Sequence, residues 1–253
     1  MAFFNGSVRS SVLEMWTGLA VCLPFDIADA DREKTPVVYL LHGQSDDHTS
    51  WLRNTSADRY AADRHMALVI PEVQRSYYAD MAYGLAYRTY ITEELPGIVE
   101  RLFGLTPDRE RTFVAGLSMG GHGALKCALG HPGQYAACAA FSSVTDTARR
   151  AEWMPEGEVI SVWGDGVKPE EDIFRLAESC AALPPPERPR IYMSCGREDH
   201  LLDHNEKFHR HLEDLGIKHT YETWSGSHEW GFWDQSLPKA LDFFLEERAS
   251  RRD

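Results

Sequence analysis

The chain has 253 residues, of which 43% are hydrophobic and 26% are charged, and its formal net charge at pH 7 is −13. This length and composition suit a single α/β domain with a substantial core, so we expect one folded domain over residues 1–253. The basic residues form no dense stripe on this acidic chain, which argues against nucleic acid and against a membrane surface as partners.

The five cysteines are scattered along the chain, and most have apolar neighbours. This pattern is typical of reduced core residues in an intracellular protein rather than of a disulfide framework. The first residues lack the basic and apolar regions of an export signal, and no stretch is apolar over a membrane-spanning length. The sequence therefore predicts a cytoplasmic location.

Apolar runs predict the strands in the first half of the chain. Residues 11–24 alternate broadly and indicate one or two opening strands, whereas the continuous runs 36–41 and 67–71 are typical of buried central strands. A helix that contains Trp51 and extends to about residue 63 should lie between these two runs. The loop 72–84 is rich in aromatic residues, which either line a binding crevice or anchor a long loop.

Strands and helices continue to alternate in the second half, which predicts a mostly parallel sheet covered by helices on both faces. Helical spacing over 87–102 includes Pro96, where we expect a kink. The alternation lapses over 144–188, which favours a small cap-like insertion with a short helix near 173–181. The remaining predicted elements are strands at 111–115, 137–142, 189–196 and 219–224 and helices at 201–215 and 234–248.

The segment 113–125 carries the most specific motif, in which an apolar strand leads into Gly-x-Ser-x-Gly and then into a helix. This pattern is typical of a nucleophile elbow, with Ser118 as the nucleophile. A serine on so sharp a turn brings neighbouring backbone close together, which explains glycine at Gly116 and Gly120. The helix that follows would direct its free N–H groups at an oxyanion beside the serine.

A His-Gly step follows the predicted strand 36–41, at the place where α/β hydrolases carry their second oxyanion donor. We therefore predict that the backbone N–H groups of Gln44 and Met119 form an oxyanion hole. We interpret His42 as a residue that braces this loop through hydrogen bonds rather than one that transfers protons.

The order Ser, acid, His along the chain selects the other two catalytic candidates. His228 is the predicted base, because it lies in a Gly- and Ser-rich turn between the last strand and the last helix. Asp199 at the end of strand 189–196 is the predicted acid; Asp203 is its rival, and Glu198 should point away.

The other histidines considered are assigned to surfaces. His122 and His131 are expected on the surface of the elbow helix. A further group is expected on a solvated helix face without a metal-ligand pattern, so no metal site is predicted; its members are His200, His204, His209 and His211.

These motifs resemble the esterase D type of α/β hydrolase, and nearly the whole chain is most similar to the bacterial tributyrin esterases. The segments that carry the resemblance are 40–43 with Trp51, 75–78 with 83–84, 94–96, 116–125, 195–199 and 226–230. The resemblance implies an α/β-hydrolase fold and a cofactor-free serine esterase with Ser118, Asp199 and His228 as its triad. It also implies short-chain acyl esters as substrates, with acetylated carbohydrates as one natural class.

Several alternatives stay open at this stage. Related branches include S-formylglutathione hydrolases, feruloyl esterases and mycolyl transferases, and a catalytically silent scaffold is the alternative outside the enzymes. The residues predicted to contact the substrate are Trp51, Tyr77, Tyr83 and Trp230. An aromatic-rich surface near the site could bind a substrate or a second subunit, so the sequence leaves open whether the protein forms a homo-oligomer.

Overall fold

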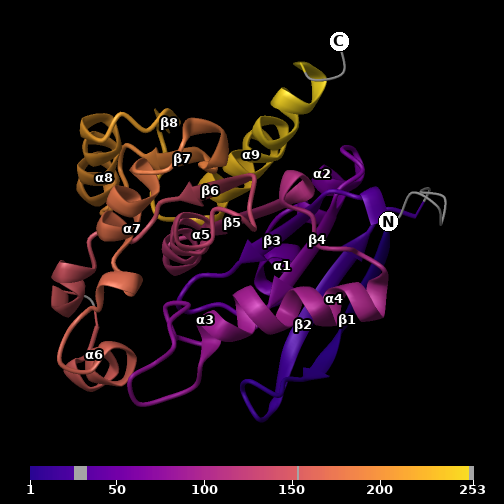
Figure 1. Cartoon of the computed structure of the whole chain (residues 1–253), viewed down its shortest axis with the longest axis horizontal. Helices are drawn as coiled ribbons and strands as arrows, with labels where there is room; N and C mark the ends of the chain where they lie inside the picture. Colours follow the sequence, from indigo (N-terminus) through magenta and orange to yellow (C-terminus); the bar gives the residue numbers. More distant parts are fainter. Residues whose placement is uncertain (26–32, 153, 251–253) are drawn as a thin grey trace.

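The computed structural model describes residues 1–25, 33–152 and 154–250. Within them a single sheet of eight strands has the order β1-β2-β4-β3-β5-β6-β7-β8 (Figure 1). Strand β2 pairs antiparallel with β1 and with β4, and all the other pairs are parallel. The predicted α/β-hydrolase fold with a mostly parallel sheet is confirmed.

The predicted strands are present, with small differences at their ends, and one further strand precedes them. The strands are β1 (Ala2–Arg9), β2 (Trp16–Leu23), β3 (Val37–Leu41), β4 (Ala67–Pro71), β5 (Thr112–Leu117), β6 (Ala137–Phe141), β7 (Arg190–Gly196) and β8 (His219–Trp224). The region 11–24 contains only β2. Strand β1 is mostly exposed at the sheet edge, so no burial pattern marks it in the sequence.

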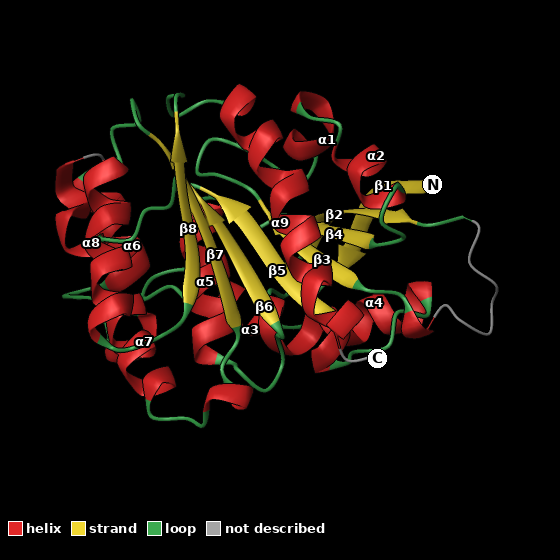
Figure 2. Cartoon of the chain, turned by 90° about the horizontal axis from the view of Figure 1, so that it is seen from above, coloured by secondary structure: helices red, strands yellow, loops and turns green. Residues whose placement is uncertain are grey.

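Helices cover both faces of the sheet (Figure 2). One apolar core contains residues of α1, α2 and α9, and the core on the other face contains residues of α3, α4, α5, α7 and α8. The helices are α1 (Ser50–Asn54), α2 (Ala57–Ala62), α3 (Tyr87–Thr89), α4 (Leu95–Phe103), α5 (Met119–Gly130), α6 (Glu156–Trp163), α7 (Ile173–Ala181), α8 (Leu202–Asp214) and α9 (Trp230–Ser250). None of the described helices has both the length and the apolar composition needed to cross a bilayer.

Two predicted helices are interrupted. The one expected over 51–63 is split into α1 and α2. The one expected over 87–102 contains a wide π-helical turn (Tyr90–Glu94) between α3 and α4. Pro96 has no N–H to donate to the Thr92 carbonyl, which instead accepts a 3.0 Å hydrogen bond from Gln134 Nε2. The proline thus coincides with a change of helix type.

The segment 144–188 divides into two parts with different roles in the fold. Helix α6 contacts the loop that precedes α3, where the Tyr83 N–H donates to the Ser161 oxygen at 2.9 Å. Helix α7 follows β6 and precedes β7 in the chain. It buries Ile173, Ala177 and Cys180 in the same core as α5. It is therefore a crossover helix of the sheet, which corrects the expectation that the whole segment is an insertion.

Candidate active site

Ser118 is located on the turn between β5 and α5, with an unusual backbone φ of 52°. Glycine is required at the neighbouring positions 116 and 120 because other backbone atoms lie where a side chain would begin. A Cβ atom on Gly116 would lie 2.3 Å from the Gly120 oxygen, and one on Gly120 would lie 2.4 Å from the Leu41 oxygen. The chain thus forms the strand, sharp turn and helix that the motif predicts.

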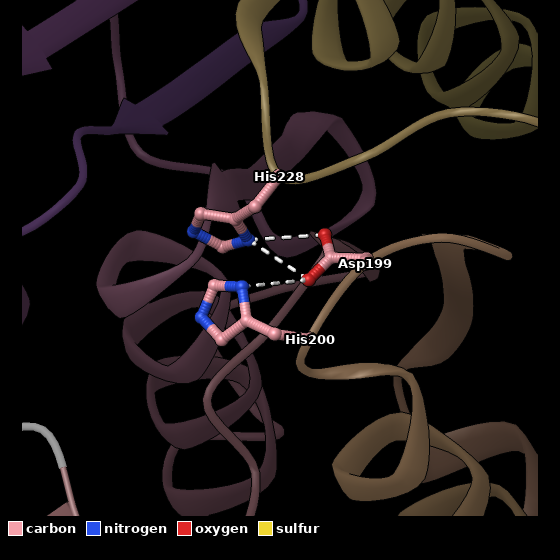
Figure 3. A group of neighbouring side chains, drawn as sticks. All are labelled: Asp199, His200 and His228. Carbon is pink, nitrogen blue, oxygen red and sulfur yellow. Dashed lines mark hydrogen bonds and ion pairs between the residues drawn. The ribbon is translucent and has the colours of Figure 1, made fainter.

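Ser118, His228 and Asp199 come together from three separate loops. His228 Nε2 lies 3.0 Å from Ser118 Oγ, and His228 Nδ1 lies 3.1 and 3.0 Å from the two Asp199 carboxylate oxygens. Figure 3 shows the imidazole facing the carboxylate. Asp199 only accepts hydrogen bonds when ionised, so Nδ1 carries the proton and Nε2 accepts the serine O–H.

Asp199 is buried but remains suited to the ionised form. Burial by itself would raise the pKa of Asp199, but hydrogen bonding and charge from His228 and the Leu201 N–H at 2.9 Å lower it below the ordinary value. The rival acid, Asp203, is exposed and pairs with Arg149 instead.

His200 lies beside His228, and both rings face the Asp199 carboxylate (Figure 3). Its Nδ1 atom is 3.6 Å from Asp199 Oδ1, and its ring centroid is 4.7 Å from that of His228. Among the described residues, Asp199, His200 and His228 are the group whose ligand atoms are close enough to hold a metal ion. Asp199 and His228 already hydrogen-bond to each other, in the geometry that the predicted Ser-His-Asp triad needs.

The two predicted oxyanion donors come from different parts of the chain. Gln44 follows β3 and lines the cavity at Ser118. Met119 is the first residue of α5, where a backbone N–H has no partner within the helix. His42 braces the first loop, because its Nδ1 donates to the Gly43 oxygen at 2.8 Å and its Nε2 accepts from the Val73 N–H at 3.2 Å.

A cavity of about 520 Å³ opens above Ser118. Tyr77 and Trp230 line it, together with the apolar side chains of Leu117, Val144 and Trp233. The ring of Trp233 also lies 5.0 Å from that of His228, edge to face, and so limits where the imidazole can move.

The other two aromatic residues predicted to contact substrate lie elsewhere. Trp51 is fully buried, donates from Nε1 to the Leu41 oxygen at 3.0 Å, and packs edge to face against Trp230. It therefore supports the cavity wall from behind. Tyr83 is 72% exposed and is not part of the cavity lining. Its N–H donates to the Ser161 oxygen of α6, which holds the loop but turns the ring to solvent.

Glu198 is exposed and does not bond to His228; its Oε2 accepts from the Gly226 N–H at 2.6 Å, which connects the turn after β7 to the loop that carries His228. Two histidines differ from their expected surface positions. His122 and His204 are buried rather than surface-exposed. The sequence contains a signal that His122 is buried, because almost every neighbour in its helix is apolar or glycine. The structure agrees, since α5 is buried on all sides.

Comparisons with known proteins show the family of this chain. The Esterase family model matches residues 10–244. An acetyl esterase of Caldicellulosiruptor saccharolyticus is 26% identical over 266 residues, which cover 96% of this chain and 98% of that protein.

Two solved structures from Staphylococcus aureus are also similar, and each comparison covers 96% of this chain and 98% of the other. The fluorophosphonate-binding serine hydrolase FphF has a TM-score of 0.89 at 29% identity, and the S-formylglutathione hydrolase FrmB has 0.85 at 30% identity. The chain therefore belongs to the Esterase family and is a carboxylic ester hydrolase with an α/β-hydrolase fold.

Proposed function

We propose that this chain hydrolyses short-chain acyl esters, with Ser118 as nucleophile, His228 as base and Asp199 as acid. The observation that carries the proposal is the continuous set of hydrogen bonds from Asp199 through His228 to Ser118 Oγ, at the floor of an open cavity. Each member has a partner at 3.0 Å, as general-base activation of a hydroxyl requires.

Acylation begins when His228 Nε2 takes the Ser118 proton and Oγ attacks the ester carbonyl. The negative charge that develops on the carbonyl oxygen is stabilised by the Gln44 and Met119 N–H groups, each worth about 3–4 kcal/mol in such sites. Asp199 stabilises the imidazolium. The proton on Nε2 then passes to the departing alkoxide, and the alcohol leaves an acyl-serine.

Deacylation repeats these steps with water. His228 takes a proton from water, which attacks the acyl carbonyl, and the second tetrahedral intermediate collapses to release the acid and restore Ser118. The scheme uses side chains and backbone of the chain alone, so the proposal includes no cofactor.

The substrate class rests on the relatives. The acetyl esterase, matched over nearly its whole length, supports a short acyl group. The S-formylglutathione hydrolase structure supports a glutathione thioester as a second candidate, which the same triad would cleave. Acyl transfer to an alcohol uses the same acyl-serine and differs only in the acceptor.

Hydrolysis of p-nitrophenyl esters from acetate to decanoate, by the wild type and by Ser118→Ala, tests the proposal. We expect an optimum at short chains and no turnover above background in the variant, with an unchanged melting temperature. S-formylglutathione measured beside the esters decides between ester and thioester. Undiminished activity in Ser118→Ala would remove Ser118 from the mechanism.

A further inference from the structure

The side chain of Gln44, whose backbone N–H is the proposed oxyanion donor, is bound at both ends. Its Nε2 donates to Glu158 Oε1 at 3.2 Å, and its Oε1 accepts from the Tyr77 hydroxyl at 3.2 Å. A carboxylate can only accept, so the amide nitrogen must face Glu158 and the amide oxygen must face Tyr77. Both partners come from distant segments of the chain, one of them helix α6.

Glu158 is itself held in one orientation. Arg75 Nε donates to Oε1 at 2.6 Å and Arg75 Nη2 to Oε2 at 2.8 Å, which is a bidentate pair. These bonds lower the pKa of Glu158 below its ordinary value, against a smaller opposing effect of burial, so the carboxylate is ionised at neutral pH.

Helix α6 is fastened to the loop that carries Tyr77. The Ala82 N–H donates to the Val162 oxygen at 3.0 Å, next to the bond between Tyr83 and Ser161. The ring of Trp163 lies 5.0 Å from that of Tyr77. Helix α6 and the loop thus pack as one unit, which reaches Gln44 through Glu158 and Tyr77.

We propose that Glu158 is a positioning residue of the oxyanion hole and acts through the Gln44 side chain. The inference rests on the proposed function. An oxyanion donor is effective only when it lies about 2.7–3.1 Å from the developing charge, and small displacements weaken it. Fixing the Gln44 side chain from two sides restrains the backbone N–H next to it. The benefit arises in the transition state, so it affects kcat more than KM.

The first test compares Glu158→Ala with Glu156→Ala, an exposed acid on the same helix. For Glu158→Ala we expect kcat on the best p-nitrophenyl ester to fall about 5- to 50-fold, less than the 10²–10³-fold cost of losing a whole donor. KM should stay within about twofold, and Glu156→Ala should match the wild type. Glu158→Gln keeps an acceptor for Gln44 Nε2, and we expect it to recover most of kcat.

The second test is a double-mutant cycle with Gln44→Ala, which removes the side chain but keeps the backbone N–H. If Glu158 acts through Gln44, adding Glu158→Ala to Gln44→Ala causes no further loss. Independent, multiplying losses would overturn the proposal, as would wild-type kcat in Glu158→Ala. Melting temperatures of all variants identify any that lose activity by unfolding.

The rate at which a fluorophosphonate labels Ser118 provides a readout that needs no turnover. If the wild type cleaves no ester, the proposed function fails, and the labelling rates of the same variants still decide the role of Glu158. We expect slower labelling in Glu158→Ala than in Glu156→Ala. Equal rates would overturn the positioning role.

Discussion

Ser118 has backbone angles that a serine seldom adopts, with φ at 52° and ψ at −116°. Such a conformation costs on the order of 1–3 kcal/mol and persists only where the surroundings impose it. Here the Ser118 N–H donates to the Phe141 oxygen at 2.9 Å, and its carbonyl accepts from the N–H groups of His122 and Val144. These three bonds hold the backbone of the turn from which Ser118 Oγ lies 3.0 Å from His228 Nε2.

Replacing Asp199, the proposed acid, should separate its role from that of its rival, Asp203. Asp199→Asn leaves the shape but no longer favours the Nδ1–H tautomer of His228, so we expect kcat to fall roughly 10⁴-fold, as in other serine triads. Asp203→Asn serves as the matched control, because Asp203 is exposed and pairs with Arg149. Comparable losses in both variants would refute the assignment of Asp199.

Among the elements, α5 packs unusually closely against β3 and β5. The backbone of Gly120 lies against the carbonyls of Leu41 and His42, so the elbow depends on the absence of a side chain there. Every residue from Met119 to Leu129 is buried, including Lys126, whose ammonium donates to Glu171 Oε2 and to the Tyr77 oxygen. The proposed nucleophile Ser118 thus lies at the start of a helix that is buried along nearly its whole length.

Two glycine-to-alanine changes should therefore have opposite effects. Gly120→Ala places a Cβ 2.4 Å from a backbone oxygen, and we expect it to lower the free energy of unfolding by at least about 3 kcal/mol. Gly97→Ala in α4 meets no atom within 4 Å and should raise the free energy of unfolding by about 0.5–1 kcal/mol. Urea unfolding of both variants measures the difference. Similar stabilities would mean that the elbow is looser than the structure indicates.

On the scale of the whole molecule, buried histidines link stability to pH. Burial, reinforced by the Lys126 ammonium, holds the pKa of His122 well below its ordinary value, and burial also lowers the pKa of His131 and His219. Below about pH 6.5 the unfolded chain binds protons at these positions before the folded chain does. The free energy of unfolding must therefore fall as the pH falls through this range.

The titration of His122 alone should lower the free energy of unfolding by at most about 1.4 kcal/mol between pH 7.5 and pH 5.5. His122→Asn removes that titration, so we expect a smaller loss over the same interval than in the wild type, whatever its stability at pH 7.5. Urea unfolding at the two pH values provides the comparison, with circular dichroism to confirm the folded state at each. An identical loss in both proteins would show that the folded state protonates His122 readily.

The sequence by itself determined the features that depend on near neighbours in the chain. The buried strands read as apolar runs, and the elbow reads as a strand, Gly-x-Ser-x-Gly and a helix, because these patterns act over a few residues. The chain order of Ser118, Asp199 and His228 pointed to three residues that the structure brings within hydrogen-bond distance. The spacing of glycines and the ends of strands depend on residues that are close together in the chain, so they can be recognised in a single sequence.

Only the tertiary structure decided which distant segments meet. Glu158 contacts Gln44 across 114 residues of chain, and no local pattern announces that pair. Trp51 is a support rather than a cavity wall because Trp230 packs in front of it. The order of the strands likewise decides that β1 lies exposed at the edge of the sheet and that α7 connects two neighbouring strands, β6 and β7. The surroundings of these side chains depend on how the helices pack against the sheet. The spacing of residues along the chain does not show that packing.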